Sequence, residues 1–119
     1  MYEDVVNDIA DMLRPFVRCK TYSIIDRLAN ATSKEVVEVA LYEALRISRS
    51  AAGSYLCKED EKEIRPYIAK EENIDRLLIE LDEDLMRGLE IVRRIAIKSL
   101  SWPEKREDVP ESVRPRETL

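Results

Sequence analysis

The longest helical pattern in this chain is residues 74–99, IDRLLIELDEDLMRGLEIVRRIAIKS. Apolar or small side chains recur there every three or four residues, which is typical of an amphipathic helix that covers a core. The stripe consists of Ile74, Leu77, Leu78, Leu81, Leu85, Gly88, Leu89, Val92, Ile95, Ala96 and Ser99. We expect one helix of about 40 Å, capped by Asn73. Because Gly88 costs a helix about 1 kcal/mol relative to Ala, we expect a neighbouring helix to approach closely there.

Three shorter helices are predicted before this one. The first spans about residues 2–13, because Pro15 disfavours a helical conformation at the residue before it. The second runs from about residue 21 to residue 30. The third begins at a capping box, with Thr32 as N-cap and Glu35 reaching back to it. Its inward side chains are Val37, Ala40, Leu41, Ala44, Leu45 and Ser48, and Gly53 is the expected residue just past its end.

Residues 54–72 are mostly charged and contain Pro66, so we expect a loop or short helix there. The apolar side chains expected to anchor it are Tyr55, Leu56, Ile64, Tyr67 and Ile68. Only two Gly are present among 119 residues, and Ala, Leu, Ile, Glu, Lys and Arg are common. The sequence therefore predicts an all-α fold. It is a small bundle of four to five helices over residues 1–103, with a long C-terminal helix and a disordered charged tail at 104–119.

The chemistry open to this chain is narrow, because it contains no histidine. Histidine-dependent nucleophiles and metal sites are excluded, and two cysteines do not make a four-ligand zinc site. Acidic pairs at magnesium-ligand spacing are Glu35/Glu38, Glu80/Glu83 and Glu72/Asp75, but the first two are expected to face away from the apolar stripes. We therefore expect no catalytic residues, no metal and no cofactor. A magnesium-dependent all-α nucleotide pyrophosphatase stays as the least favoured alternative.

The cellular setting is inferred from the same composition. No signal peptide and no apolar run of membrane-spanning length is visible, so we expect a cytoplasmic protein. Cys19 and Cys57 are then expected to be free thiols. A disulfide between them stays open, since the high charged fraction and the absence of Gln are typical of thermophiles, whose cytosolic proteins do carry disulfides.

The net charge of −5 is distributed unevenly. Residues 14–49 and 87–98 each carry an excess of three basic side chains, whereas residues 58–86 carry an excess of six acidic ones. The basic side chains have two interpretations: a solvated, ion-paired surface, or a face for nucleic acid or an acidic partner. The pairs expected on the last helix are Glu83 with Arg87 and Glu90 with Arg94. The nucleic-acid candidates are Tyr42, Arg46, Arg49, Arg93, Arg94 and Lys98.

Three segments of the first half resemble a known family: LRPFV at 13–17, YSIIDRLAN at 22–30 and SKEVVEVALYEALR at 33–46. They are similar to the small subunits of archaeal type I-A CRISPR effector complexes, although the β portion of some members is not visible here. The resemblance implies a non-catalytic subunit that contacts neighbouring subunits and helps to hold the target DNA strands. In such complexes the guide RNA reads the sequence, so the protein needs only backbone contacts. A protein–protein adaptor without nucleic-acid contact is the alternative, and self-association stays open.

Overall fold

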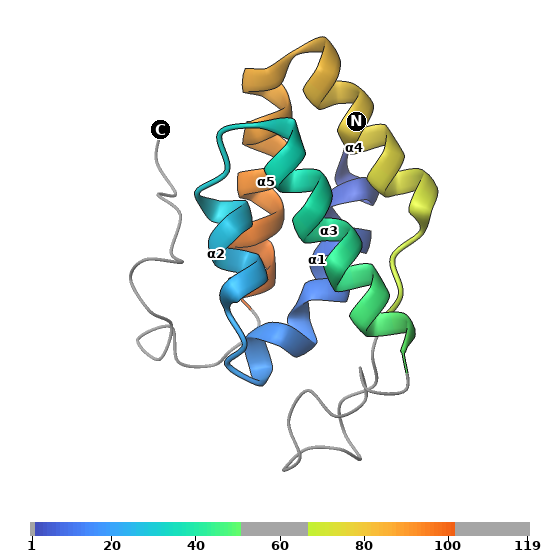
Figure 1. Cartoon of the computed structure of the whole chain (residues 1–119), viewed down its shortest axis with the longest axis vertical. Helices are drawn as coiled ribbons and strands as arrows, with labels where there is room; N and C mark the ends of the chain where they lie inside the picture. Colours follow the sequence, from blue (N-terminus) through green and yellow to red (C-terminus); the bar gives the residue numbers. More distant parts are fainter. Residues whose placement is uncertain (1, 51–66, 102–119) are drawn as a thin grey trace.

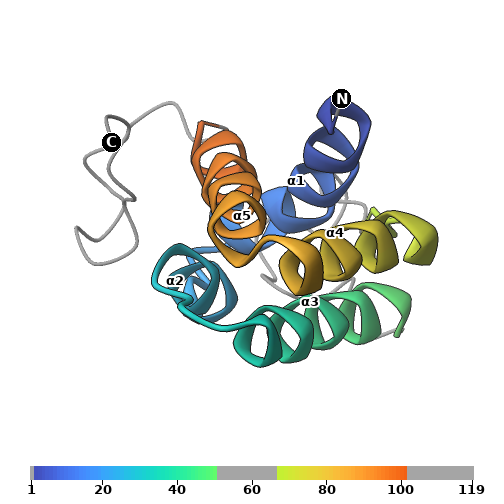
Figure 2. The ribbon, with the colours of Figure 1, turned by 90° about the horizontal axis from the view of Figure 1, so that it is seen from above.

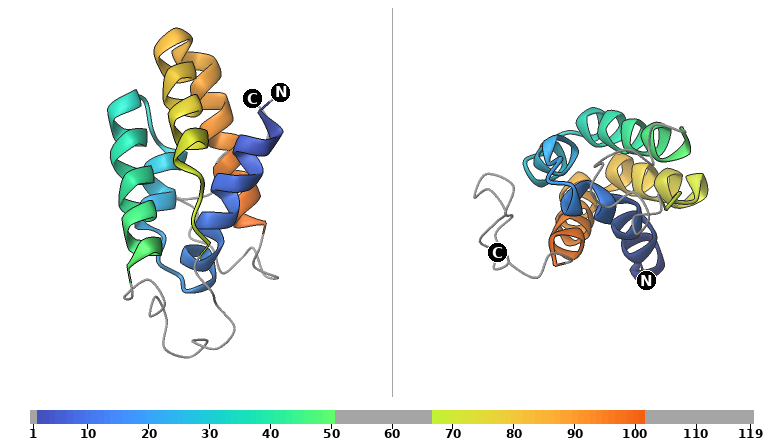
Figure 3. Two further views of the ribbon diagram at one scale, coloured as in Figure 1. Left: turned by 90° about the vertical axis from the view of Figure 1, so that its right-hand side faces the viewer. Right: turned by 90° about the horizontal axis from the view of Figure 1, so that it is seen from below.

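The computed structural model describes residues 2–50 and 67–101, and all of its regular structure there is helical. Figure 1 shows the arrangement, and Figures 2 and 3 show that α3 and α4 lie side by side on one face while α5 and α1 lie on the other. The helices are α1 (Glu3–Arg18), α2 (Ser23–Ala29), α3 (Lys34–Arg49), α4 (Glu71–Glu83) and α5 (Leu85–Leu100). The all-α prediction is confirmed.

The predicted long C-terminal helix is wrong: the chain forms two antiparallel helices instead (Figure 1). The break is at Asp84, whose backbone is extended (φ −149°, ψ 91°) and whose side chain caps α5 by accepting from the Arg87 amide at 3.3 Å. Because the chain reverses there, Leu85 leaves the apolar stripe and is 41% exposed. Arg87 likewise contacts Glu80 of α4 and not Glu83.

The close approach predicted at Gly88 is confirmed, and the approaching helix is α4. A Cβ atom at Gly88 would lie 2.5 Å from Leu81 Cδ2 and 2.9 Å from the Leu81 Cα. Real Cβ atoms do not approach backbone so closely, so the missing side chain at residue 88 lets the two halves of the hairpin pack together.

The capping role of Asp84 can be tested by replacing it with Ala, because the change in the free energy of unfolding has one sign for two helices and the opposite sign for one continuous helix. Losing an N-cap side chain costs about 1 kcal/mol, so Asp84→Ala should lower the free energy of unfolding by that amount. In one continuous helix the same change would be stabilising, because Ala is the better helix former. Urea unfolding measures the difference, and Glu83→Ala, one residue earlier and without a cap role, is the control. A more stable Asp84→Ala variant would contradict the hairpin.

The first helix is longer than predicted, because Pro15 lies inside it. Helix α1 continues to Arg18, and Figure 1 shows its last turn bending away from the axis of the first part. Phe16 and Val17 in this turn are fully buried. Their burial offsets the hydrogen bond that proline removes, which the local sequence rule does not register.

The second helix lies within its predicted range, while the start of the third is one residue later than predicted. Ser33, and not Thr32, is the N-cap of α3, and its Oγ accepts from the Val36 amide at 3.4 Å. All six side chains predicted to face inward on α3 are buried.

Helix α4 begins at Glu71 with Lys70 as its N-cap, so Asn73 is not the cap. Asn73 lies in the first turn and donates a hydrogen bond to Asp8 of α1 at 2.7 Å.

Tyr67 and Ile68, predicted to be apolar anchors, are exposed, and Ala69 is the buried residue of that stretch. The other predicted features between 51 and 66 lie outside the described residues: Gly53, Tyr55, Leu56, Ile64 and Pro66. The predicted tail at 104–119 lies outside them as well.

Cysteine 19 corrects the expectation of free thiols. Cys19 follows α1 directly and is disulfide-bonded. Cys57, which is the other cysteine of the sequence, lies outside the described residues.

Candidate nucleic-acid interface

The last two turns of α3 bring three of the predicted side chains to one place. Tyr42, Arg46 and Arg49 line a surface hollow of about 450 Å³, together with Leu45 and Ser50. They lie at i, i+4 and i+7, so the helix itself places them on one face. An aromatic ring beside two guanidinium groups is the combination that stacks a base and holds a phosphate.

The three side chains differ in how firmly the protein already holds them. The Tyr42 hydroxyl donates to Asp75 of α4 at 2.9 Å, and Arg49 forms an ion pair with Glu71 at the start of α4. Burial of the Tyr42 ring and its bond to Asp75 raise the pKa of that hydroxyl, which stays a neutral donor. Arg46 is exposed and has no ion-pair partner among residues 2–50 and 67–101. Arg46 is therefore the cation that is readiest to meet a phosphate.

The three predicted cations of α5 do not form one cluster. Arg94 forms an ion pair with Glu3, and Lys98 donates to the side chain of Asn7, so both lie against α1. Arg93 is one residue away from Arg94, which turns it by about 100° around the helix. Adjacent residues on a helix do not share a face, so Arg93 is separated from the other two.

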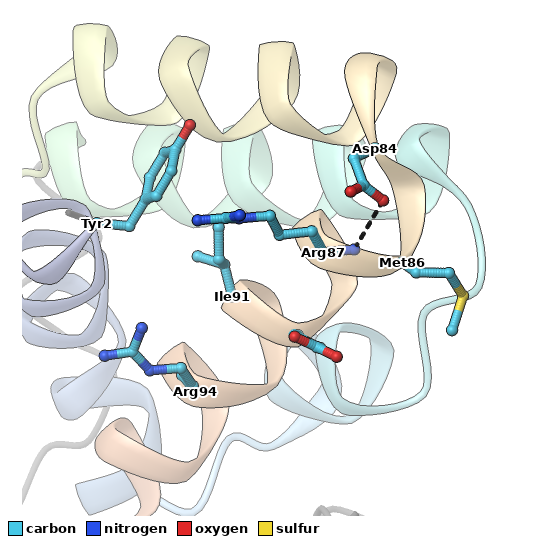
Figure 4. A pocket seen from close by; sticks show the side chains of 7 residues that line it. Tyr2, Asp84, Met86, Arg87, Ile91 and Arg94 are labelled. Carbon is cyan, nitrogen blue, oxygen red and sulfur yellow. Dashed lines mark hydrogen bonds between the residues drawn. The ribbon is translucent and has the colours of Figure 1, made fainter.

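A second hollow of about 460 Å³ lies between the beginnings of α1 and α5 (Figure 4). Arg87 and Arg94 line it with Tyr2, whose hydroxyl donates to Glu80 at 3.0 Å; that bond raises the pKa of Tyr2. Asp84 and Glu90 line it as well, so its charge is balanced. Sequence reasoning missed Tyr2 and Arg87 here, because Tyr2 reads as a core residue and Arg87 as one member of a helical ion pair.

The two candidate groups lie on separate faces of the bundle. Figure 2 shows α3 on one side and the α1–α5 pair on the other, with α2 and α4 between them. One nucleic-acid strand does not touch both groups without passing around an edge of the molecule. Because Arg94 and Lys98 hold α5 to α1, whereas Arg46 holds nothing in the described parts of the chain, the α3 hollow is the better candidate interface.

The acidic pairs that suggested magnesium do not converge. Within the described ranges, no three cysteine, aspartate or glutamate side chains are grouped so that they hold a metal ion. Glu80, predicted on the solvated face, is instead largely buried and accepts hydrogen bonds from Tyr2 and pairs with Arg87.

Asp8 is a buried carboxylate that the sequence did not single out. It accepts three hydrogen bonds: from the Tyr67 hydroxyl at 2.5 Å, from the Lys70 backbone amide at 2.9 Å and from the Asn73 side chain at 2.7 Å. The bond to Asp8, with partial burial, raises the pKa of Tyr67 to about 12. Because all its donors come from the start of α4, Asp8 is a structural anchor between α1 and α4.

None of the described helices combines the length and apolar character needed to cross a membrane. In comparisons with known proteins, the family model described as CRISPR-associated protein (Cas_Csa5) matches residues 12–97. Neither the curated proteins nor the solved structures contain a match. The matched range includes α2, α3 and α4 in full and therefore the whole α3 hollow.

Proposed function

The chain belongs to the Cas_Csa5 family of CRISPR-associated proteins, and from that premise we propose that it is a non-catalytic small subunit of a type I-A interference complex. The observation that carries the proposal is the family match over residues 12–97. The resemblance of residues 13–46 to such small subunits rests on part of the same stretch and supports it.

In this role the protein contacts neighbouring subunits and helps to hold the target strand through its phosphates. The α3 hollow supports the second part, because Arg46 lacks an ion-pair partner within the described residues and Arg49 and Tyr42 adjoin it. A guanidinium that meets a phosphate fixes the strand's position without reading its sequence. That division suits a complex in which base pairing to the guide reads the sequence.

The acidic character of the protein limits what it does alone. Its net charge is −5, and Glu71 and Asp75 border the hollow through their bonds to Arg49 and Tyr42. We therefore expect weak, salt-sensitive binding of nucleic acid by the isolated protein, and productive contact only where neighbouring subunits add positive charge. An adaptor role without nucleic-acid contact is the alternative outcome of the experiment below.

The test uses the complex reconstituted with Arg46→Ala, Arg49→Ala and the double variant. Each lost phosphate contact should reduce the slope of log affinity against log salt by about 1, so the double variant should capture target DNA with a slope smaller by about 2. Assembly, measured separately as the amount of small subunit that co-purifies, should be unchanged.

Lys34→Ala is the matched control, because it removes one positive charge from the other end of α3, where Lys34 pairs with Asp82 at 2.8 Å. The control should leave the salt slope as it is. Loss of assembly with an unchanged slope in the double variant favours the adaptor alternative. If neither quantity moves, these arginines serve only the solubility of the bundle.

A further inference from the structure

We infer that a different protein subunit docks a basic surface on α3 and α4, at the end of these helices nearest the α4–α5 turn. This inference rests on the proposed role in a multisubunit complex. We call this surface the acidic α3–α4 face, and it consists of Glu35, Glu38, Val39, Ile79 and Glu83. All five side chains are exposed.

The pairing of α3 with α4 places these residues together. Lys34 contacts Asp82 at 2.8 Å and Tyr42 contacts Asp75 at 2.9 Å, so the two helices run antiparallel at this seam. Position 38 lies midway between residues 34 and 42, and position 79 lies midway between residues 75 and 82. Glu38 and Ile79 therefore occupy the same level, and Val39 is adjacent.

The apolar members of this face are unusually exposed. Val39 is 60% exposed and Ile79 is 56% exposed, although both helices have a well-filled core side. Single exposed apolar residues are ordinary on protein surfaces. Here two of them share one level of two paired helices and are surrounded by carboxylates, which is the composition of a small interface centre with a charged rim.

Helix stability accounts for Glu35, which lies in the favourable first turn of α3, but it does not account for the acids at the end of α4. The last turn of α4 contains Asp82 and Glu83 and no basic residue. The C-terminal end of a helix carries partial negative charge, so acidic side chains there are destabilising and basic ones are preferred. Asp82 forms an ion pair with Lys34, which also attracts Glu38 and Glu35, whereas Glu83 has no ion pair among the described residues.

These charges select the partner. Carboxylates repel a phosphate backbone, so nucleic acid is disfavoured on this face. They attract lysine and arginine side chains, and charge complementarity of this kind fixes the orientation of a complex and raises its association rate. The acidic α3–α4 face therefore fits a basic, partly apolar protein surface, and it leaves the α3 hollow at the other end of the same helix free for the strand.

The experiment measures how much small subunit joins the reconstituted complex when Ile79 is replaced. Ile79→Lys and Ile79→Glu both remove the apolar contact, but only the lysine reverses the local charge. Incorporation should fall about tenfold for Ile79→Lys, the loss that one central interface residue typically causes, and distinctly less for Ile79→Glu. Ile68→Lys, which alters a 48% exposed residue just before α4 begins, should incorporate like the unaltered protein.

A carbodiimide cross-linker then identifies the neighbour, because it joins a carboxylate to a lysine amine only where the two are in contact. Cross-links from Glu35, Glu38 or Glu83 to lysines of a different subunit support the inference. Equal losses for Ile79→Lys and Ile79→Glu, full incorporation of Ile79→Lys, or cross-links to a second copy of this chain would overturn it while leaving the subunit role intact. Failure of the unaltered protein to join the complex would instead defeat the proposed function, and the inference with it.

Discussion

Asp8→Ala should lower the free energy of unfolding by about 2–3 kcal/mol, because it leaves one buried donor, on Asn73, and two partly buried donors without an acceptor. The amide of Lys70 and the side-chain nitrogen of Asn73 both donate to Asp8, at 2.9 and 2.7 Å. An orphaned buried donor costs about 1–3 kcal/mol, and a domain of this size has only about 5–15 kcal/mol in total. Urea unfolding followed by circular dichroism measures the loss.

The matched control is Asp11→Ala, one turn later on α1, where the carboxylate forms a half-exposed ion pair with Arg14 at 3.2 Å. Such a pair contributes at most about 1 kcal/mol. Asp8→Asn, which keeps the shape and one acceptor oxygen, should fall between the two. Equal small losses for Asp8→Ala and Asp11→Ala would show that Asp8 is not an anchor.

The same variant has a spectroscopic readout at high pH. In the folded protein the pKa of Tyr67 is about 12, raised from the ordinary value of 10 by its bond to Asp8. The stability from this bond is therefore fully present below pH 10 and is lost as the pH rises through 12. In Asp8→Asn the tyrosinate absorbance of Tyr67, identified by comparison with Tyr67→Phe, should appear at lower pH.

Leu81→Ala should cost about 2–5 kcal/mol, because Leu81 is 2% exposed and fills the contact between the two helices of the hairpin. Leu81 packs against Gly88 of α5, where an added Cβ would lie 2.5 Å from Leu81 Cδ2 and 2.8 Å from Leu81 Cγ. Gly88→Ala alone should therefore cost about 1–3 kcal/mol by overpacking, although Ala is otherwise the better helix former.

The two changes should not be additive. Leu81→Ala removes both side-chain atoms that meet the new Cβ and leaves the Leu81 Cα at 2.9 Å, so Gly88→Ala should cost less in that background. The expected coupling is about 0.5–3 kcal/mol by a double-mutant cycle in urea. In a Leu77→Ala background, one turn earlier on α4, Gly88→Ala should keep its full cost. Additivity in both backgrounds would mean that α4 and α5 do not pack at Gly88.

Helix type and the faces of α3 were readable from the sequence, because both follow from spacing along a single helix. The inward side of α3 was predicted completely, and Tyr42, Arg46 and Arg49 were predicted on one face since i, i+4 and i+7 neighbours share it in any helix. Every α-helix has the same number of residues per turn, so these predictions hold whatever surrounds the helix.

Contacts between helices were not readable in this way. Asp8 reads as an ordinary acidic residue of α1, and its three donors are about 60 residues away at the start of α4. The split of Arg93 from Arg94 and Lys98 likewise depends on α1 lying along one side of α5. These neighbours are set by which faces pack, and no local spacing contains that information.

The stretch from Ile74 to Ser99 shows both sides of this division. Its periodicity determined that the segment is helical and amphipathic, but an unbroken stripe fits one long helix as well as two helices that fold back on each other. The tertiary structure decided for the hairpin: Asp84 caps α5, Gly88 admits Leu81, and both halves bury their apolar sides in one core. Helices α1 and α3 have 16 residues each and are about 24 Å long, so a single helix of about 40 Å would extend past them and leave part of its apolar stripe in water. Folding back at Asp84 buries both halves of the stripe instead.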